Sequence, residues 1–282
     1  MHCLINISMK LSVITINYNN RDGLRKTIES VVNQTYKDFE YIVIDGGSTD
    51  GSVDVIKEYA DKIDYWVSEP DKGIFNAMNK GVKVAKGEYL IFMNSGDMFF
   101  NAEIIDNVFS LNIKEDIVCG DMALSIGDVK YVPKELTMEF FYKSSLSHQA
   151  SFIKRDVQLC FPYDETKKIV SDWRFYIESI VLNNASYRKI DLIVSLFDFG
   201  GVSNTQREVE MLERQSVLRE LIPLCILKDY EQNENIKFRK FFSMVEKTNF
   251  RKLIYSICVI IVTVISFFTG SKWVRNFNVL EK

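Results

Sequence analysis

The first 120 residues alternate between short apolar runs and segments of helical periodicity, and this alternation constrains the fold more than any other feature. Runs rich in β-branched and aromatic residues predict strands at 11–16, 39–45, 89–93 and 116–120, with a weaker one at 63–67. Between them, apolar residues such as Leu24, Ile28 and Val31 fall on one helical face. The alternation predicts an α/β fold with a mostly parallel sheet, helices on both faces, and a ligand beyond the carboxyl ends of the strands.

The remainder of the chain is less regular. Residues 129–132, 150–154 and 192–199 are candidate strands, a clear helix begins at Ser171, and residues 205–221 form a charge-laced helical pattern. We therefore expect a globular α/β domain at 9–205, an outer helical segment at 206–236 and a C-terminal segment at 237–282.

The C-terminal segment has a different character. Residues 253–271 carry no charge and are mostly apolar, and residues 237–252 before them mix basic and aromatic side chains. An apolar run of about 18–20 residues is just long enough to cross a bilayer, and a basic aromatic helix suits a headgroup surface. We expect membrane association and leave open whether the run spans the bilayer or lies in one leaflet. A buried helix or a dimerisation helix is the alternative.

Composition excludes several classes of protein. With 35 Lys and Arg against 38 Asp and Glu, the chain has no basic excess for binding nucleic acid. Two histidines nearly exclude a multi-histidine zinc site. The five cysteines are scattered and odd in number, which favours free thiols in a reducing compartment. Residues 1–6 lack the features of a signal peptide, and Met9 is an alternative start.

Polar residues collect directly after three apolar strands, at 17–20, 45–52 and 94–97. Each cluster alone fits an ordinary turn or a helix cap, but three on adjacent strands predict one polar crevice. The chain has no Walker A motif and no GxGxxG after its first strand. A divalent cation held by oxygen ligands is the remaining way to bind phosphate, and Asp97 with Asn94 would provide such ligands.

Two further polar positions stand in the middle of the chain. Asp172, at the start of the helix after Ser171, is either a capping carboxylate or a general base on a rigid helix end. His148 is either a structural hydrogen-bonding residue or a contact for a bound ligand.

These motifs resemble the family-2 glycosyltransferases of GT-A fold, which are inverting enzymes that use nucleotide-diphospho sugars. The similar segments are 12–19, 43–52 and 94–97, and also 69–81, 147–150 and 200–203, which resemble bacterial members that build surface polysaccharides. The resemblance covers about residues 10–205 in consistent order and makes the α/β domain the GT-A catalytic domain.

The resemblance implies roles for individual residues. Asp45 matches the acidic residue that contacts the nucleotide base, residues 94–97 match the Asp-x-Asp region that holds metal and diphosphate, and Asp172 matches the catalytic base. Two departures are Gly46, where a second acidic residue is usual, and Asn94 with Gly96, where carboxylates are usual. The residues expected to bind the donor are Ile16, Asn17, Tyr18, Asn19, Asp45, Gly46, Ser48, Asp71, Lys72, Asn79, Asn94, Ser95 and Gly96.

The remaining expectations concern the metal and the acceptor. Asp97 is the expected ligand of Mg²⁺ or Mn²⁺, and His148, Gln149 and Trp173 are expected near the acceptor or diphosphate. The resemblance implies transfer of a sugar to a lipid-linked or growing glycan acceptor in cell-surface polysaccharide biosynthesis, on the cytoplasmic side of a bacterial plasma membrane. The alternative is a non-catalytic, membrane-tethered glycan-assembly subunit with a degenerate metal site.

Overall fold

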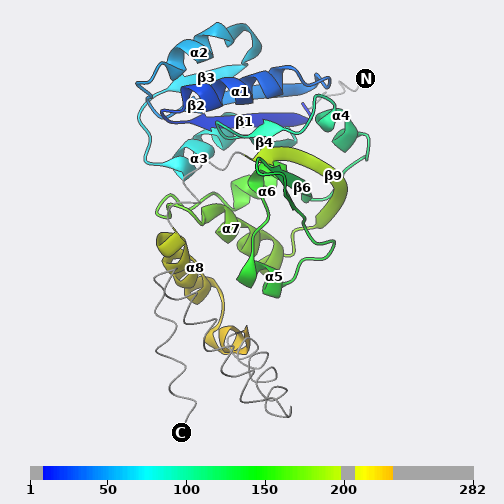
Figure 1. Cartoon of the computed structure of the whole chain (residues 1–282). Helices are drawn as coiled ribbons and strands as arrows, with labels where there is room; N and C mark the ends of the chain where they lie inside the picture. The colour runs from blue at the N-terminus through cyan, green and yellow to red at the C-terminus, as the bar shows by residue number, and fades with distance from the viewer. Residues whose placement is uncertain (1–8, 198–206, 231–282) are drawn as a thin grey trace, which may run out of the picture. The chain divides into compact units, whose positions relative to one another are not determined.

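A computed structural model describes residues 9–197 and 207–230 of the chain (Figure 1). The chain divides into two compact units, Met1–Leu221 and Ile222–Lys282, and the sheet belongs to the first. The predicted membrane-associating segment at 237–282 lies outside the described residues. Among the helices within the described ranges, none is long and apolar enough to cross a bilayer.

The N-terminal half of the sheet is parallel. Strands β1 (Leu11–Asn17), β2 (Phe39–Asp45), β3 (Tyr65–Ser68) and β4 (Tyr89–Phe92) lie in the order β3-β2-β1-β4. Every residue of β1 and β4 is buried, because helices cover a sheet of this kind on both faces. The strands predicted at 11–16, 39–45, 63–67 and 89–93 are thus present and paired as a parallel sheet, whereas the strand predicted at 116–120 is β6 (Ile117–Leu124) in the second half of the sheet.

The second half of the sheet is mixed. Next to β4 lie β8 (Ser151–Lys154), β6 (Ile117–Leu124), β9 (Tyr187–Phe197) and the two-residue β5 (Met98–Phe99) in that order, and β7 (Val129–Lys130) pairs with β6. Strand β8 runs antiparallel to both β4 and β6, whereas β9 runs parallel to β6. Strands β6 and β9 therefore run in the same direction as β1 to β4, whereas β5, β7 and β8 run against them, so the sheet is mixed with a parallel majority.

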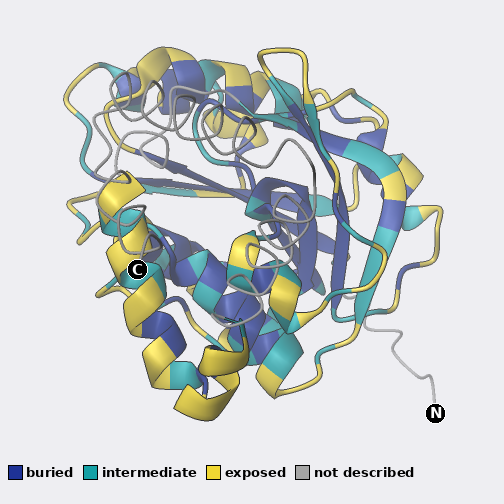
Figure 2. Ribbon diagram, turned by 60° about the horizontal axis from the view of Figure 1, so that its bottom comes forward, coloured by how far each residue is buried: buried dark blue, intermediate teal, exposed yellow. Residues whose placement is uncertain are grey.

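Helices connect and cover these strands (Figure 2), with their exposed residues outermost and the buried strands between them. Since crossovers between parallel strands are right-handed, α1 and α2 lie on one face of the sheet and α3 on the other. The helices are α1 (Arg21–Val32), α2 (Ser52–Glu58), α3 (Ile74–Val84), α4 (Ile104–Phe109), α5 (Met138–Lys143), α6 (Arg155–Cys160), α7 (Ser171–Tyr176) and α8 (Arg207–Leu221). There are also short 3-10 turns at Ala60–Lys62 and His148–Ala150, a π-helical turn at Ile177–Leu182 and a helical stretch at 224–230.

The register of the parallel strands gathers the polar ends at one edge. Asn17, the last residue of β1, lies opposite Asp45, the last residue of β2. Asp45 in turn lies opposite Ser68, the last residue of β3. The turn after β4 begins at the same edge, because Met93 and Ser95 donate their backbone N–H groups to Ile14 and Ile16 of β1.

Candidate active site

Asp45 is the centre of the hydrogen bonds at this edge. Its Oδ1 accepts from Asn17 Nδ2 at 2.7 Å and from the Ser48 hydroxyl at 2.6 Å, and its Oδ2 accepts from the Ser68 hydroxyl at 2.6 Å. Two backbone N–H groups, of Gly47 and Ser48, also donate to Oδ2. Burial by itself would raise the pKa of Asp45, but the hydrogen bonds from Ser48, Ser68 and Asn17 hold that pKa below its usual value. This fully buried carboxylate joins the ends of three strands. Its contact with the base of the nucleotide stays a prediction.

The turn after β1 is fastened to the turn after β2. The backbone N–H of Asn19 donates to the Ser48 hydroxyl at 2.8 Å, and Asn19 Oδ1 accepts from the Thr49 N–H at 2.9 Å. Asn19 takes a left-handed conformation with φ of 47°, which asparagine tolerates well. Tyr18, in the turn after β1, is 66% exposed, so its ring is available as a flat apolar surface at the sheet edge.

Gly46 leaves room for a carboxylate from another loop. A Cβ atom at Gly46 would lie 2.5 Å from Asp71 Oδ2 and 3.2 Å from Cδ2 of Tyr18. The other oxygen of Asp71 accepts from the backbone N–H of Gly73 at 2.8 Å. The Asp71 carboxylate therefore lies beside the exposed Tyr18 ring, in the space that a side chain at position 46 would fill. Lys72, the next residue, is exposed.

Helix α1 holds the turn at 94–97. The hydroxyl of Thr27 donates to the backbone oxygen of Asp97 at 2.7 Å and accepts from the Gly96 N–H at 2.9 Å. The side chain of Asn20 donates to the backbone oxygen of Ser95 at 3.0 Å. Asp97 is 5% exposed, and Asn94 Oδ1 is buried without a hydrogen-bond partner. The turn thus has a fixed backbone and presents side-chain oxygens.

His148 links this turn to α7. Its Nδ1 lies 3.0 Å from Asp172 Oδ2, and its Nε2 lies 3.0 Å from Asn94 Nδ2. The two side chains of the first pair are 15% and 19% exposed. Three residues singled out from distant parts of the sequence are therefore in direct contact in one row.

Four other residues that we predicted to contact the donor or the acceptor are buried or hydrogen-bonded within the fold. Asn79 donates to the backbone oxygen of Tyr163 at 2.8 Å and accepts from the Tyr163 N–H at 3.1 Å, so its amide holds a neighbouring loop. Trp173 is 1% exposed, and its indole N–H donates to the backbone oxygen of Phe141 at 2.8 Å. Gln149 and Ile16 are also buried. Their predicted ligand contacts stay predictions.

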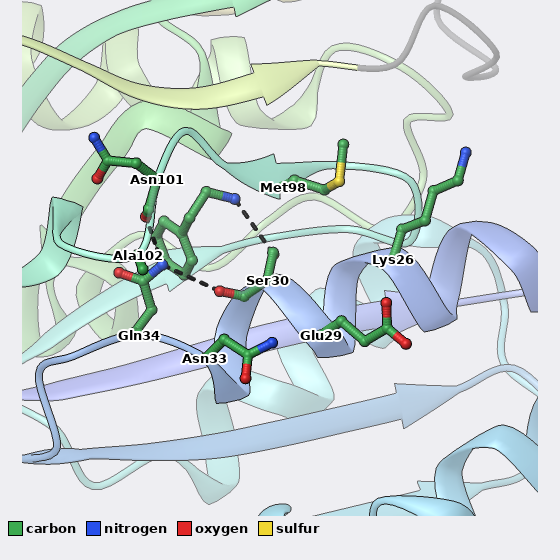
Figure 3. Close-up of a pocket in the computed structure, with 9 residues that line it drawn as sticks. Lys26, Glu29, Ser30, Asn33, Gln34, Met98, Asn101 and Ala102 are labelled. Atoms are coloured by element: carbon green, nitrogen blue, oxygen red, sulfur yellow. Dashed lines mark hydrogen bonds between the residues drawn. The ribbon is translucent and has the colours of Figure 1, made fainter.

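A groove of about 320 Å³ lies elsewhere, between α1 and residues 98–102. Figure 3 shows Gln34 reaching across it, where its amide donates to the backbone oxygens of Ser30 and Asn101 at 3.1 and 2.8 Å. Glu29, on its rim, accepts a hydrogen bond from Tyr59 at 2.8 Å. None of the residues predicted to bind donor or acceptor lines this groove.

A model of glycosyl transferase family 2 matches residues 12–164, more than half of the chain. This chain belongs to glycosyl transferase family 2. The match covers the parallel half of the sheet, the turn at 94–97 and His148, so the candidate site lies largely within it.

Relatives and solved structures agree with this assignment. A PGL/p-HBAD biosynthesis glycosyltransferase of Mycobacterium bovis is 28% identical over 211 residues, which are 72% of this chain and 82% of that protein. S. aureus TarS 1-349 in complex with UDP-GlcNAc superposes with a TM-score of 0.60 at 21% identity, covering 75% of this chain and 67% of that one. The mannosyltransferase PcManGT from Pyrobaculum calidifontis, solved with GDP-Man and Mn²⁺, gives a TM-score of 0.52 at 14% identity over 66% of this chain and 56% of that one. The last two similarities show the GT-A-like fold.

The family assignment gives the site its chemistry: sugar transfer from a nucleotide-sugar donor. Within residues 9–197 and 207–230, no group of three or more His, Cys, Asp and Glu side chains gathers as a metal cage. The turn at 94–97 nevertheless offers hard oxygen donors, since Asn94 Oδ1 is buried without a partner and Asp97 lies in the same turn. These residues fit a cation that is also coordinated by substrate phosphates, as Mg²⁺ commonly is.

Sequence analysis missed two residues that build the site, Thr27 and Ser68, and placed Asn20 in the polar cluster at 17–20 without an individual role. Thr27 is a fully buried hydroxyl on the apolar face of α1, at helical spacing from Leu24, Ile28 and Val31. A polar residue inside such a face must find hydrogen-bond partners, and this was the available signal. Ser68 gave no comparable signal, because only the register of β2 and β3 places it beside Asp45.

Proposed function

We propose that this protein is an inverting glycosyltransferase. It moves a hexose or N-acetylhexosamine from a nucleotide-diphospho donor to a lipid-linked or growing glycan acceptor during synthesis of a bacterial cell-surface polysaccharide. It works with a divalent cation at the cytoplasmic face of the plasma membrane. Membership of glycosyl transferase family 2 and the fold shared with TarS support the reaction class.

One observation carries the proposal: Asp172, His148 and Asn94 lie in contact in one row. An inverting transfer needs a base on the acceptor side of the sugar and a stabilised leaving group on the other side. Asp172, at one end of the row, would be the base on the acceptor side. The turn with Asp97, at the other end, would stabilise the leaving group. The short distance between these two ends favours well-oriented reactants.

On the donor side, Tyr18 and Asp71 suit the nucleotide base, with the ring stacking on it and the carboxylate accepting an N–H. Asn94 and Asp97 would hold a divalent cation, which supplies positive charge to the diphosphate when bound. Thr27 and Asn20 keep the backbone of that turn in place.

On the acceptor side, Asp172 takes the proton of the attacking hydroxyl, a contribution of roughly 10²–10⁴-fold for a general base. Oδ1 of Asp172 accepts from the Trp173 N–H at 2.7 Å and Oδ2 contacts His148. Each carboxylate oxygen can accept more than one hydrogen bond, so the acceptor hydroxyl still has a place.

Release of nucleoside diphosphate tests this assignment. The purified protein is offered UDP-, GDP- and dTDP-sugars with candidate acceptors, with and without Mn²⁺ or Mg²⁺. We expect Asp172→Asn to lower transfer by at least about 10²-fold while nucleotide binding stays unchanged. Asp156→Asn is the matched control, because Asp156 is also the second residue of a six-residue helix but is exposed. Normal turnover by Asp172→Asn would remove Asp172 from the mechanism.

The apolar run at 253–271 with its basic aromatic neighbour motivates the membrane location. We expect the full-length chain to sediment with liposomes of anionic lipids and to need detergent, and a chain ended near residue 248 to do neither. Equal solubility of the two proteins without detergent would contradict membrane attachment.

The substitutions at Asn94 and Gly96 favour one alternative, a non-catalytic glycan-assembly subunit. Such a protein would bind nucleotide weakly and release no nucleoside diphosphate from any donor. The same donor screen separates the two functions.

A further inference from the structure

We infer that His148 is a positioning residue that holds the Asp172 carboxylate in its reactive orientation, with its Nδ1 hydrogen bond as the part that matters for the rate. This inference rests on the proposed function, since it assigns His148 a role through the proposed base.

The chemistry of the two neighbours fixes which nitrogen carries the proton. Asp172 Oδ2 is a carboxylate oxygen and can only accept, so His148 Nδ1 donates to it at 3.0 Å. Asn94 Nδ2 is an amide NH₂ and can only donate, so His148 Nε2 accepts from it at 3.0 Å. The ring therefore carries its proton on Nδ1 and is held from both ends.

The backbone beneath the ring is rigid. His148 opens a 3-10 turn whose Ala150 N–H donates to the backbone oxygen of Ser147 at 3.0 Å. The fully buried Ser151 hydroxyl donates to the same oxygen at 2.8 Å. Strand β8, which begins at Ser151, pairs with both β4 and β6. The imidazole thus projects from a segment anchored in the middle of the sheet.

Asp172, by contrast, stands on a short helix with few contacts to hold its side chain. Among the described residues, its Oδ1 accepts only from the neighbouring Trp173 N–H at 2.7 Å. The His148 bond to Oδ2 joins this carboxylate to the turn before β8, and Lys130 of β7 attracts the carboxylate electrostatically. Loss of that bond would let the carboxylate rotate, and a misplacement of about 1 Å can cost on the order of 10²-fold in rate.

Two variants separate the Nδ1 bond from the Nε2 bond. In His148→Asn the side-chain amide reaches the position of Nδ1 and can still donate to Asp172. In His148→Gln the longer amide reaches the position of Nε2 and Asn94 but not Asp172. We expect kcat to stay within about tenfold of the wild type in His148→Asn and to fall on the order of 10²-fold in His148→Gln.

The KM for the donor and the affinity for its nucleoside diphosphate should stay within about twofold in both variants, because the inferred role concerns the base. Equal loss of kcat in the two variants, or a full rate in His148→Gln, would overturn the inference. A parallel rise of the donor KM would assign His148 to the donor instead.

A spectroscopic measurement on the wild-type chain keeps the inference testable if the variants fail to fold. The chain has only two histidines, His2 and His148, so ¹⁵N-histidine NMR with a His2→Gln reference assigns the second ring directly. We expect a proton on Nδ1, the atom that faces Asp172. A ring that carries its proton on Nε2 alone would overturn the inference. A wild-type chain that shows the Nδ1 proton but releases no nucleoside diphosphate would refute the proposed function and leave this geometry standing.

Discussion

At the scale of single residues, the candidate site depends on which side chains take the place of the carboxylates expected at positions 46, 94 and 96. Gly46 stands where the resemblance leads us to expect a second acidic residue, and the space beside it holds the Asp71 carboxylate from the next loop. The exposed ring of Tyr18 lies next to the same space. The acidic character of this corner is therefore kept, although the residue that supplies it comes from a different part of the chain.

A methyl group at position 46 tests this exchange. In Gly46→Ala the new Cβ would lie 2.5 Å from Asp71 Oδ2, and the flexible end of that side chain must move away. We expect nucleoside diphosphate binding, followed by calorimetry, to weaken to the same degree in Gly46→Ala and Asp71→Ala. The double variant should bind nucleoside diphosphate no more weakly than either single variant, because both changes take the same Asp71 carboxylate away from its position. Additive losses would mean that Asp71 does not act through the space beside Gly46.

At the scale of elements, the sequence predicts the strands and helices that are long enough to show a hydrophobic period. The strands at 11–16, 39–45 and 89–93 were placed within one residue of β1, β2 and β4, because buried strands between turns give a strong signal. Strand β9 starts at Tyr187, five residues before the predicted 192, because charged residues interrupt its first part. The two-residue β5 and the six-residue α4, α5 and α6 are too short for any period to show.

The site was predictable to the same extent. The turns after β1, β2 and β4 follow from strands whose ends meet at one edge. The contact of His148 with Asn94 and Asp172 depends on the packing of α7 and on the antiparallel direction of β8, which the predicted strand at 150–154 did not indicate. Sequence thus named the members of this row and left their arrangement to tertiary structure.

At the scale of the whole molecule, each half of the sheet contains a carboxylate that hydrogen bonds hold between its strands. Asp116 lies just before β6, accepts from the Ser186 N–H and hydroxyl at 2.9 and 2.7 Å, and accepts from Lys154 of β8 at 3.0 Å. Burial by itself would raise the pKa of Asp116, but the hydrogen bonds from Ser186 and Lys154 hold that pKa below its usual value. Asp45 has a lowered pKa for a similar reason in the parallel half.

These shifts predict how stability depends on pH. A carboxyl whose pKa is lowered in the fold stabilises the fold above its unfolded pKa of about 3.9, and this contribution is lost as the pH falls through the lower folded value. The free energy of unfolding should therefore be nearly constant above about pH 5 and should fall steeply below about pH 4.

Asp116→Asn gives this expectation a single-residue test. The variant should lose on the order of 1 kcal/mol in urea unfolding at pH 7. The difference from the wild type should shrink toward zero as the pH falls below the folded pKa, because the wild-type carboxyl is then also uncharged. Asp156→Asn, at an exposed position, is the control and should change little at either pH. A difference that persists undiminished in acid would show that Asp116 contributes through shape or hydrogen-bond geometry instead of through its charge.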